Sequence, residues 1–403
     1  MTKTLARPAD TYTPTYFLAS LGAGGTAVSF FMYLFFWVPH PGQPVPVFED
    51  IAAAWAKGVL PQQIGIVVAM LGIALFAILN IKSLIWNLQA FAAFKKTPAW
   101  EEMKNANTES SALAMPLALA MSVNVGFVLG LVFVPGLWRV VEYLFPAAMV
   151  AFALIGILAF RQLGAFLGRV LSKGGIFDVT AHNSFAQLLP AFAISMIAVG
   201  FAAPAAMSTN PATVGTALVL STFLGITAIL YTVMAAATAL NSMLHYGTAR
   251  EAGPTLLIIV PIMTVLGIMF LRQEHGMHVT FDVQTSAGET MIFLARMLSV
   301  QVVFLLLGLT VLRAQNYFHD FVLGPKTSAG SYALVCPAVA LSVMMQFFIN
   351  KGLVASGLVD KFGLGFWLLT GVALAAQAVA IWLILRLNRQ HFGRPQALAV
   401  PAE

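Results

Sequence analysis

Residues 184–204 read SFAQLLPAFAISMIAVGFAAP, an uncharged apolar run with a proline inside it. A helix needs about 20 apolar residues to cross the hydrocarbon core of a bilayer, roughly 30 Å thick. Similar runs recur along the chain, which is 60% hydrophobic and 9% charged, whereas soluble domains carry about 25% charged residues. Because the runs are continuous and do not alternate with a period of two, the sequence predicts an all-α polytopic membrane protein and disfavours a transmembrane β-barrel.

Ten such runs are present, and short loops join them into five helical hairpins within one membrane domain, residues 1–403. The polar stretch MTKTLARPADTYTPTY leads into a run of full spanning length, which predicts a retained first helix and no cleaved signal peptide. The ten predicted spans lie near residues 14–38, 63–88, 111–134, 141–160, 184–204, 212–240, 254–271, 290–312, 329–350 and 363–387.

Basic residues are distributed unequally between the two sets of loops. Of the 21 Lys and Arg residues, 15 fall on the side that holds both termini, 5 fall on the other side, and Arg296 lies within the eighth span. Cytoplasmic loops carry the excess of Lys and Arg. We therefore expect both termini in the cytoplasm. The membrane itself is expected to be the bacterial inner (plasma) membrane. The net charge of +6 is too small to indicate nucleic-acid binding.

The composition also argues against several kinds of cofactor site. One cysteine cannot form an internal disulfide or a multi-thiolate metal site. The seven histidines lie in loops or at span ends, so no pair is placed to hold a haem in the membrane. The motif HGMH at residues 275–278 lacks supporting thiolates or carboxylates for a metal. We expect no cofactor, no metal and no enzymatic activity.

Four prolines occupy matching places in the chain. They lie in the odd-numbered spans three, five, seven and nine, about 71 to 76 residues apart, which favours a repeated hairpin. Within a helix, proline frees a carbonyl, which is tolerated in a membrane where it faces protein or a watery cavity. The odd spans are therefore expected to surround a common pore, with kinks at Pro116, Pro190, Pro261 and Pro337 and at Gly22 of the LGAGG stretch in span one.

The residues directly before these prolines are expected to form one constriction layer. Few polar groups follow on the odd spans, and no Asp, Glu, Lys or Arg lies near their centres, which favours passive movement over coupled transport. The predicted site consists of the layer Met115, Leu189, Val260 and Cys336, the polar lining Ser122, Asn124, Ser195, Thr264 and Ser342, and the gate candidates Phe17, Phe185 and Phe347.

Two short motifs carry a resemblance to a known family. TPTYFLASLGAGG contains Pro14, Phe17 and a Leu-Gly pair, and YALVCP joins Tyr332 to Pro337. With ten spans and kinked odd helices, the chain resembles the tellurite-resistance/dicarboxylate transporter family, which includes bacterial TehA and the plant slow-type anion channels, and within it a TsoY-like branch. The resemblance implies trimers whose protomers each pass small inorganic or organic anions through five inner helices ringed by five outer ones. Family members have a gate phenylalanine where this chain has Cys336.

Three functions remain open at this point. The first is a passive anion channel or channel-like transporter. The second is a secondary transporter of organic or chalcogen oxyanions. The third is a membrane redox or sensor protein that uses Cys336. A reactive thiol needs a nearby cation or helix N-terminus, whereas the neighbours of Cys336 in sequence are apolar.

Overall fold

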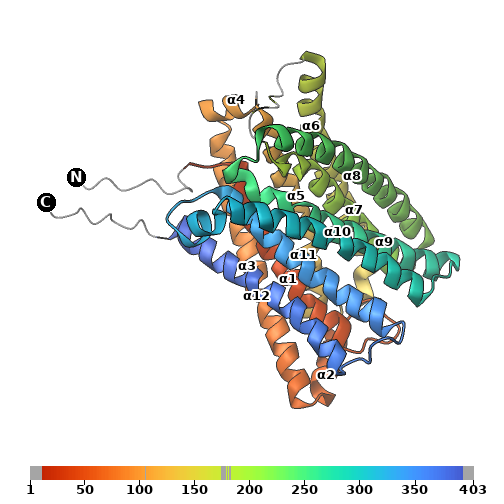
Figure 1. The fold of residues 1–403 in the computed structure, drawn as a ribbon. Coiled ribbons are helices and arrows are strands. Elements are labelled where there is room, and N and C mark those ends of the chain that lie inside the picture. Colours follow the sequence, from red (N-terminus) through yellow and green to blue (C-terminus); the bar gives the residue numbers. More distant parts are fainter. Residues whose placement is uncertain (1–10, 105, 174–177, 179, 181–182, 394–403) are drawn as a thin grey trace.

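The computed structural model describes residues 11–104, 106–173, 178, 180 and 183–393. This part of the chain is helical without β-strands, and it contains 10 helices long and apolar enough to cross a membrane. Figure 1 shows the long helices side by side, with short α4 (Pro98–Lys104) and α2 (Phe48–Lys57) at opposite ends. The prediction of an all-α polytopic membrane protein with ten spans is confirmed.

The ten long helices divide into an inner and an outer set. In their most apolar stretches the inner helices are 50 to 100% buried, and the outer helices 22 to 33%. The inner set is α1 (Phe17–Trp37), α5 (Ala114–Phe133), α7 (Leu189–Met207), α9 (Ile259–Phe281) and α11 (Val335–Phe347). The outer set is α3 (Leu60–Phe94), α6 (Val141–Lys173), α8 (Pro211–Tyr246), α10 (Ala287–Ala314) and α12 (Leu364–Phe392).

The inner helices form a closed ring. Each contacts two inner neighbours, in the order α1, α5, α7, α9, α11 and back to α1, while each outer helix packs on its hairpin partner. Large apolar side chains cover the exposed faces of the outer helices, as expected for a surface in lipid. We call the end of the bundle that holds residues 11 and 393 the terminal end, and the opposite end the far end.

A polar contact ties the two helical stretches of each hairpin together. In lipid a buried polar group needs a protein partner. Thus the Asn80 amide of α3 donates to the Ser20 carbonyl of α1, at 2.8 Å, and the Gln301 amide of α10 donates to the Val260 carbonyl of α9, at 2.8 Å. The remaining hairpins have Arg169 paired with Glu109, Ser242 bonded to Asn183 and Tyr332 bonded to Asn388.

The four prolines mark the start of the α-helical part of a span. A 3₁₀ segment precedes every inner helix: Pro14–Tyr16, Asn107–Leu113, Phe185–Leu188, Arg250–Leu257 and Ala329–Leu334. Pro116, Pro190, Pro261 and Pro337 are then the second or third residue of the α-helix. The prolines thus lie inside the predicted spans, at the junction of the 3₁₀ and α-helical parts and not in the interior of an α-helix. Proline is tolerated in a first turn because N–H groups there have no intrahelical acceptor.

Gly22, the fifth predicted kink, has a packing role. It lies within α1, which continues without a break to Trp37. A Cβ at this position would come 2.7 Å from the Val335 Cγ1 atom of α11. The missing side chain lets α1 approach α11 and thereby helps to close the ring.

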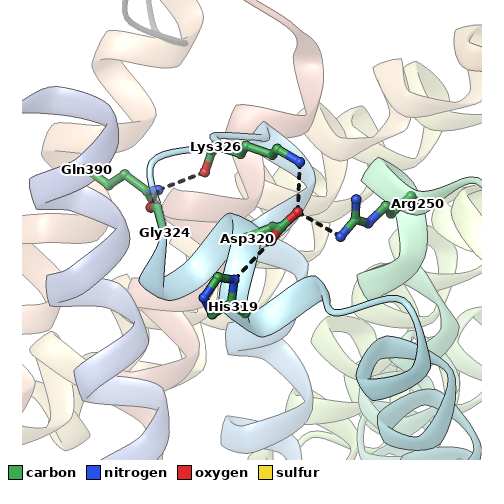
Figure 2. A network of polar contacts seen from close by, with 6 residues as sticks. All are labelled: Arg250, His319, Asp320, Gly324, Lys326 and Gln390. Atoms are coloured by element: carbon green, nitrogen blue, oxygen red, sulfur yellow. Dashed lines mark hydrogen bonds and ion pairs between the residues drawn. The ribbon is translucent and has the colours of Figure 1, made fainter.

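A polar network links three elements at the terminal end. Figure 2 shows Asp320, in the connection between α10 and the 3₁₀ segment before α11, accepting from Arg250 at 2.8 Å and from Lys326 at 2.7 Å. Gln390 of α12 donates to the carbonyls of Gly324, at 3.2 Å, and Lys326, at 3.0 Å. The network therefore ties the first residue of the segment before α9 to this loop, and the loop to the last turns of α12.

The ionised form of Asp320 stabilises this network, which predicts a pH dependence. Hydrogen bonds from Lys326 and His319 hold the pKa of the Asp320 carboxyl well below its usual range. A carboxyl whose pKa is lowered on folding stabilises the fold above its unfolded pKa of about 3.9, and this contribution is lost as the pH falls further. We expect the melting temperature in detergent at pH 7 to be lower for D320N than for the parent, with a gap that narrows toward pH 3.

The Asp360→Asn variant is the control, because Asp360 lies at the far end and has no ion pair among the described residues. The difference in melting temperature between D360N and the parent should change little with pH. Added salt should also reduce the difference in melting temperature between the parent and D320N at pH 7, since these charges are close to solvent. A D320N gap that stays constant from pH 7 to pH 3 contradicts the prediction.

Candidate functional site

A cavity of about 510 Å³ lies at the centre of the ring. Every inner helix contributes a stripe of side chains spaced by three or four residues, which places them on one helix face. On α11 the stripe starts at Cys336 and continues through Val339, Val343 and Phe347. On α7 it includes Phe192, Met196 and Val199.

The cavity reaches the far end and stops within the ring on its way to the terminal end. Connections at the far end line its mouth through Val45, Thr285 and Ala355. Among the described residues that line it, those nearest the terminal end form what we call the floor: Leu21, Gly22, Met121, Phe192, Pro261 and Cys336. Below the floor the first turns of the inner helices are packed, and Leu117, Leu188 and Val335 are each 0% exposed.

The predicted constriction layer is mostly wrong. Cys336 lies in the floor, but Met115, Leu189 and Val260 are buried against neighbouring helices and do not line the cavity. The reason is rotation about each helix axis. The residue before the proline faces the cavity on α11, whereas on α9 the proline itself does so, and on α7 the residue two positions after it. Equivalent sequence positions therefore do not face the same way.

Of the three gate candidates, one lines the cavity. Phe347 does so in its upper part, where its ring lies 5.2 Å from that of Phe36. Phe17 and Phe185 lie at the terminal end, packed on Phe91 and Phe304, and do not line the cavity. The aromatic side chain in the floor is a residue that the sequence analysis missed, Phe192, which is 3% exposed.

Two of the five predicted polar residues line the cavity, and both already have acceptors. Thr264 donates to the Ala340 carbonyl at 3.0 Å, and Asn124 donates to the Ala120 carbonyl at 3.1 Å. The prediction is wrong for Ser122, Ser195 and Ser342, which do not line it. The Ser122 and Ser195 hydroxyls instead donate to carbonyls of their own helices, a common alternative for serine in a helix.

Charged and titratable side chains line the upper part of the cavity, whereas the sequence predicts odd spans without Asp, Glu, Lys or Arg near their centres. They are Arg272, Glu274, His275 and His278 of α9, with Lys351. The seventh span was predicted to end at residue 271, but α9 continues to Phe281. The polar residues after position 271 predict the end of the span there. The helix nevertheless continues, because these side chains face the cavity and not lipid. The signal for this was the continued spacing of Thr264, Ile268, Arg272 and His275.

Protein contacts position these charges. An Arg272 guanidinium N–H donates to the Val199 carbonyl of α7 at 2.8 Å. Glu274 accepts from the Thr290 hydroxyl of α10 at 3.1 Å. Lys351 lies in a π-helical turn, Phe348–Val354, that continues α11. Among the described residues no hydrogen bond or close ion pair holds its ammonium, which Glu274 attracts electrostatically, so its donors remain available to a ligand.

The cavity thus combines an apolar lower part with an upper part where two cations, Arg272 and Lys351, outnumber the carboxylate of Glu274. The described residues contain no group of three or more His, Cys, Asp or Glu side chains that could hold a metal ion. Compared with known proteins, the chain matches no family model, no curated protein and no solved structure.

Proposed function

We propose that this protein moves anions across a membrane along the axis of its inner ring, as a channel or channel-like transporter. The observation that carries the proposal is a cavity, lined chiefly by the five inner helices, whose cationic side chains are Arg272 and Lys351. A cavity of this kind favours anions over cations, because low-dielectric walls strengthen the field of the charges inside. In this proposal the far end is extracytoplasmic, as the distribution of basic loops favours, and the membrane is the bacterial inner membrane.

The structure is closed on the terminal side, so passage requires the floor to open. The floor is apolar apart from the Cys336 thiol. An apolar constriction resists a hydrated ion, and such constrictions gate by excluding water. In this proposal the charged upper part of the cavity binds the anion first. When the floor opens, the anion passes between the first turns of the inner helices.

A coupled secondary transporter is the second candidate. A cavity open at one end matches one state of an alternating-access cycle, and such transporters keep ionisable residues within the bundle. The sequence argued against coupling because no charged residue was expected near the centres of the odd spans. Glu274 and His275 both line the cavity, so that argument no longer holds. The third candidate, a redox or sensor role for Cys336, has little support, because this thiol lies among apolar floor residues without the cation that activates a thiolate.

Flux in liposomes tests the proposal. We expect the purified protein to pass chloride, nitrate and small carboxylates, and R272Q to reduce that flux about tenfold, since a hydrogen bond to a charged group contributes about 1.5 kcal/mol or more. K361Q is the matched control, because Lys361 is exposed in the far-end connection and does not line the cavity.

Currents that reverse at the anion equilibrium potential support a channel. Saturable uptake that requires a proton gradient supports the secondary transporter. Equal flux of potassium and chloride, or an R272Q flux no lower than that of K361Q, contradicts anion passage through this cavity.

A further inference from the structure

The upper and lower parts of the cavity have opposite chemistry. Arg272, His275, His278 and Lys351 line the part toward the far end, whereas phenylalanine, methionine and valine side chains dominate the part toward the floor. On α9 the distance from Pro261, in the floor, to Arg272 is about 16 Å along the helix at 1.5 Å per residue. A ligand that fills the cavity therefore meets both environments.

The lower part has no strong hydrogen-bond donor left for a charge. The Thr264 hydroxyl is bonded to the Ala340 carbonyl, and the Asn124 amide donates to the Ala120 carbonyl and contacts the Met196 sulfur at 3.7 Å. The remaining polar side chain of the floor is the thiol of Cys336, a weak donor. A small anion held here would lose its hydration without replacement, whereas an apolar group would gain contact with the walls.

The upper part offers donors and positive charge. Among the described residues, Val199 is the single acceptor for the Arg272 guanidinium, which has five N–H donors. Lys351 has three donors and no protein acceptor among these residues. Side chains tilt toward the start of their helix, and the inner helices start at the terminal end, so the Arg272 side chain extends from its backbone toward the floor, where it meets Val199. Glu274 is held by Thr290 of α10.

From this division we infer that the cavity binds an amphipathic organic anion, with its carboxylate at Arg272 and Lys351 and its apolar body directed to the floor. The inference rests on the proposed function, because it names the class of anion that the same cavity holds. A volume of about 510 Å³ suits such a molecule, since small-molecule sites commonly measure about 300–1,000 Å³. Guanidinium groups bind carboxylates through paired hydrogen bonds.

Calorimetric titration of the purified full-length protein with acetate, butyrate, hexanoate and octanoate tests the inference. We expect affinity to rise about fourfold per added methylene, as burial of apolar carbon predicts. R272Q with K351Q should weaken octanoate binding about tenfold or more, the effect of losing a charge-assisted bond. The K361Q protein is the control for loss of a lysine outside the cavity, and its octanoate binding should equal that of the parent. Protein-free micelles measure the partition of octanoate into the detergent.

A second variant tests the orientation of the ligand. C336F adds bulk to the floor, so it should weaken octanoate binding while acetate and butyrate binding changes little. The inference is overturned if octanoate binds no more tightly than acetate. It is also overturned if octanoate binds the double variant as tightly as it binds K361Q. If chloride still passes in that case, the proposed function stands. Tight octanoate binding without flux of any anion supports the inference and contradicts the proposed transport function.

Discussion

Replacing Phe192 with alanine is expected to raise anion flux in liposomes about tenfold or more. Phe192 is the aromatic side chain in the floor of the cavity and is 3% exposed. A barrier lowered by only about 1.4 kcal/mol increases a rate tenfold. Removing the ring widens the apolar floor, and a wider constriction admits water more readily.

Phe185→Ala is the matched control for this experiment. Phe185 precedes α7, is 1% exposed, and packs on Phe304 without lining the cavity. Loss of a buried phenylalanine costs about 3–5 kcal/mol in the free energy of unfolding. F185A should therefore be destabilised at least as much as F192A, but its floor stays intact. Flux should rise in F192A only. If both variants become equally permeable, the cause is general loosening of the bundle, and the assignment of the floor to Phe192 is wrong.

The sequence predicted the number of helices and the division into hairpins because both depend on long apolar runs. A bilayer requires about 20 such residues per crossing, and the loops contain the polar residues and glycines that end the runs. The ends of the outer helices were predicted less well. α3, for example, reaches Phe94, beyond the predicted end at residue 88, because a helix can continue past the apolar layer while its polarity rises.

The site was harder to predict, because the rotation of each helix about its axis decides which of its side chains face the cavity. The spacing of Val339, Val343 and Phe347 identifies one face of α11, but it does not say whether that face meets the cavity or another helix. Cys336 and Met115 both precede a proline, yet only Cys336 lines the cavity. Only the packing of neighbours, such as Val335 against Gly22, determines which face is inward.

At Arg272 the sequence is misleading for a different reason. Charged residues are costly in lipid, so polarity predicts that the seventh span ends before this residue. The structure places the guanidinium in the lining of the cavity, bonded to the Val199 carbonyl. The continuation of α9 beyond this point depends on close contact with α7, and that contact predicts a large effect of a small substitution.

Gly276→Ala is expected to destabilise the protein by about 3 kcal/mol or more. A Cβ on Gly276 would come 2.3 Å from the Ala205 backbone carbonyl oxygen of α7. Overpacking commonly costs about 1–3 kcal/mol where side chains can yield, but here the obstacle is backbone within the ring. Because Gly276 is one turn beyond Arg272, separation of α9 from α7 should also displace the Arg272 guanidinium from Val199. We expect a lower melting temperature in detergent together with reduced anion flux.

Gly126→Ala in α5 separates this effect from the general consequence of adding a methyl group to a glycine. Gly126 also lies in an inner helix, but a Cβ there would meet no atom within 4 Å. Alanine at such a position is more favourable than glycine by about 0.5–1 kcal/mol, because glycine loses more backbone entropy on folding. G126A should therefore melt at or above the temperature of the parent, while G276A melts below it. A G276A protein as stable as G126A would show that α9 and α7 do not approach as closely as the structure indicates, and the placement of Arg272 at the cavity would then lose its support.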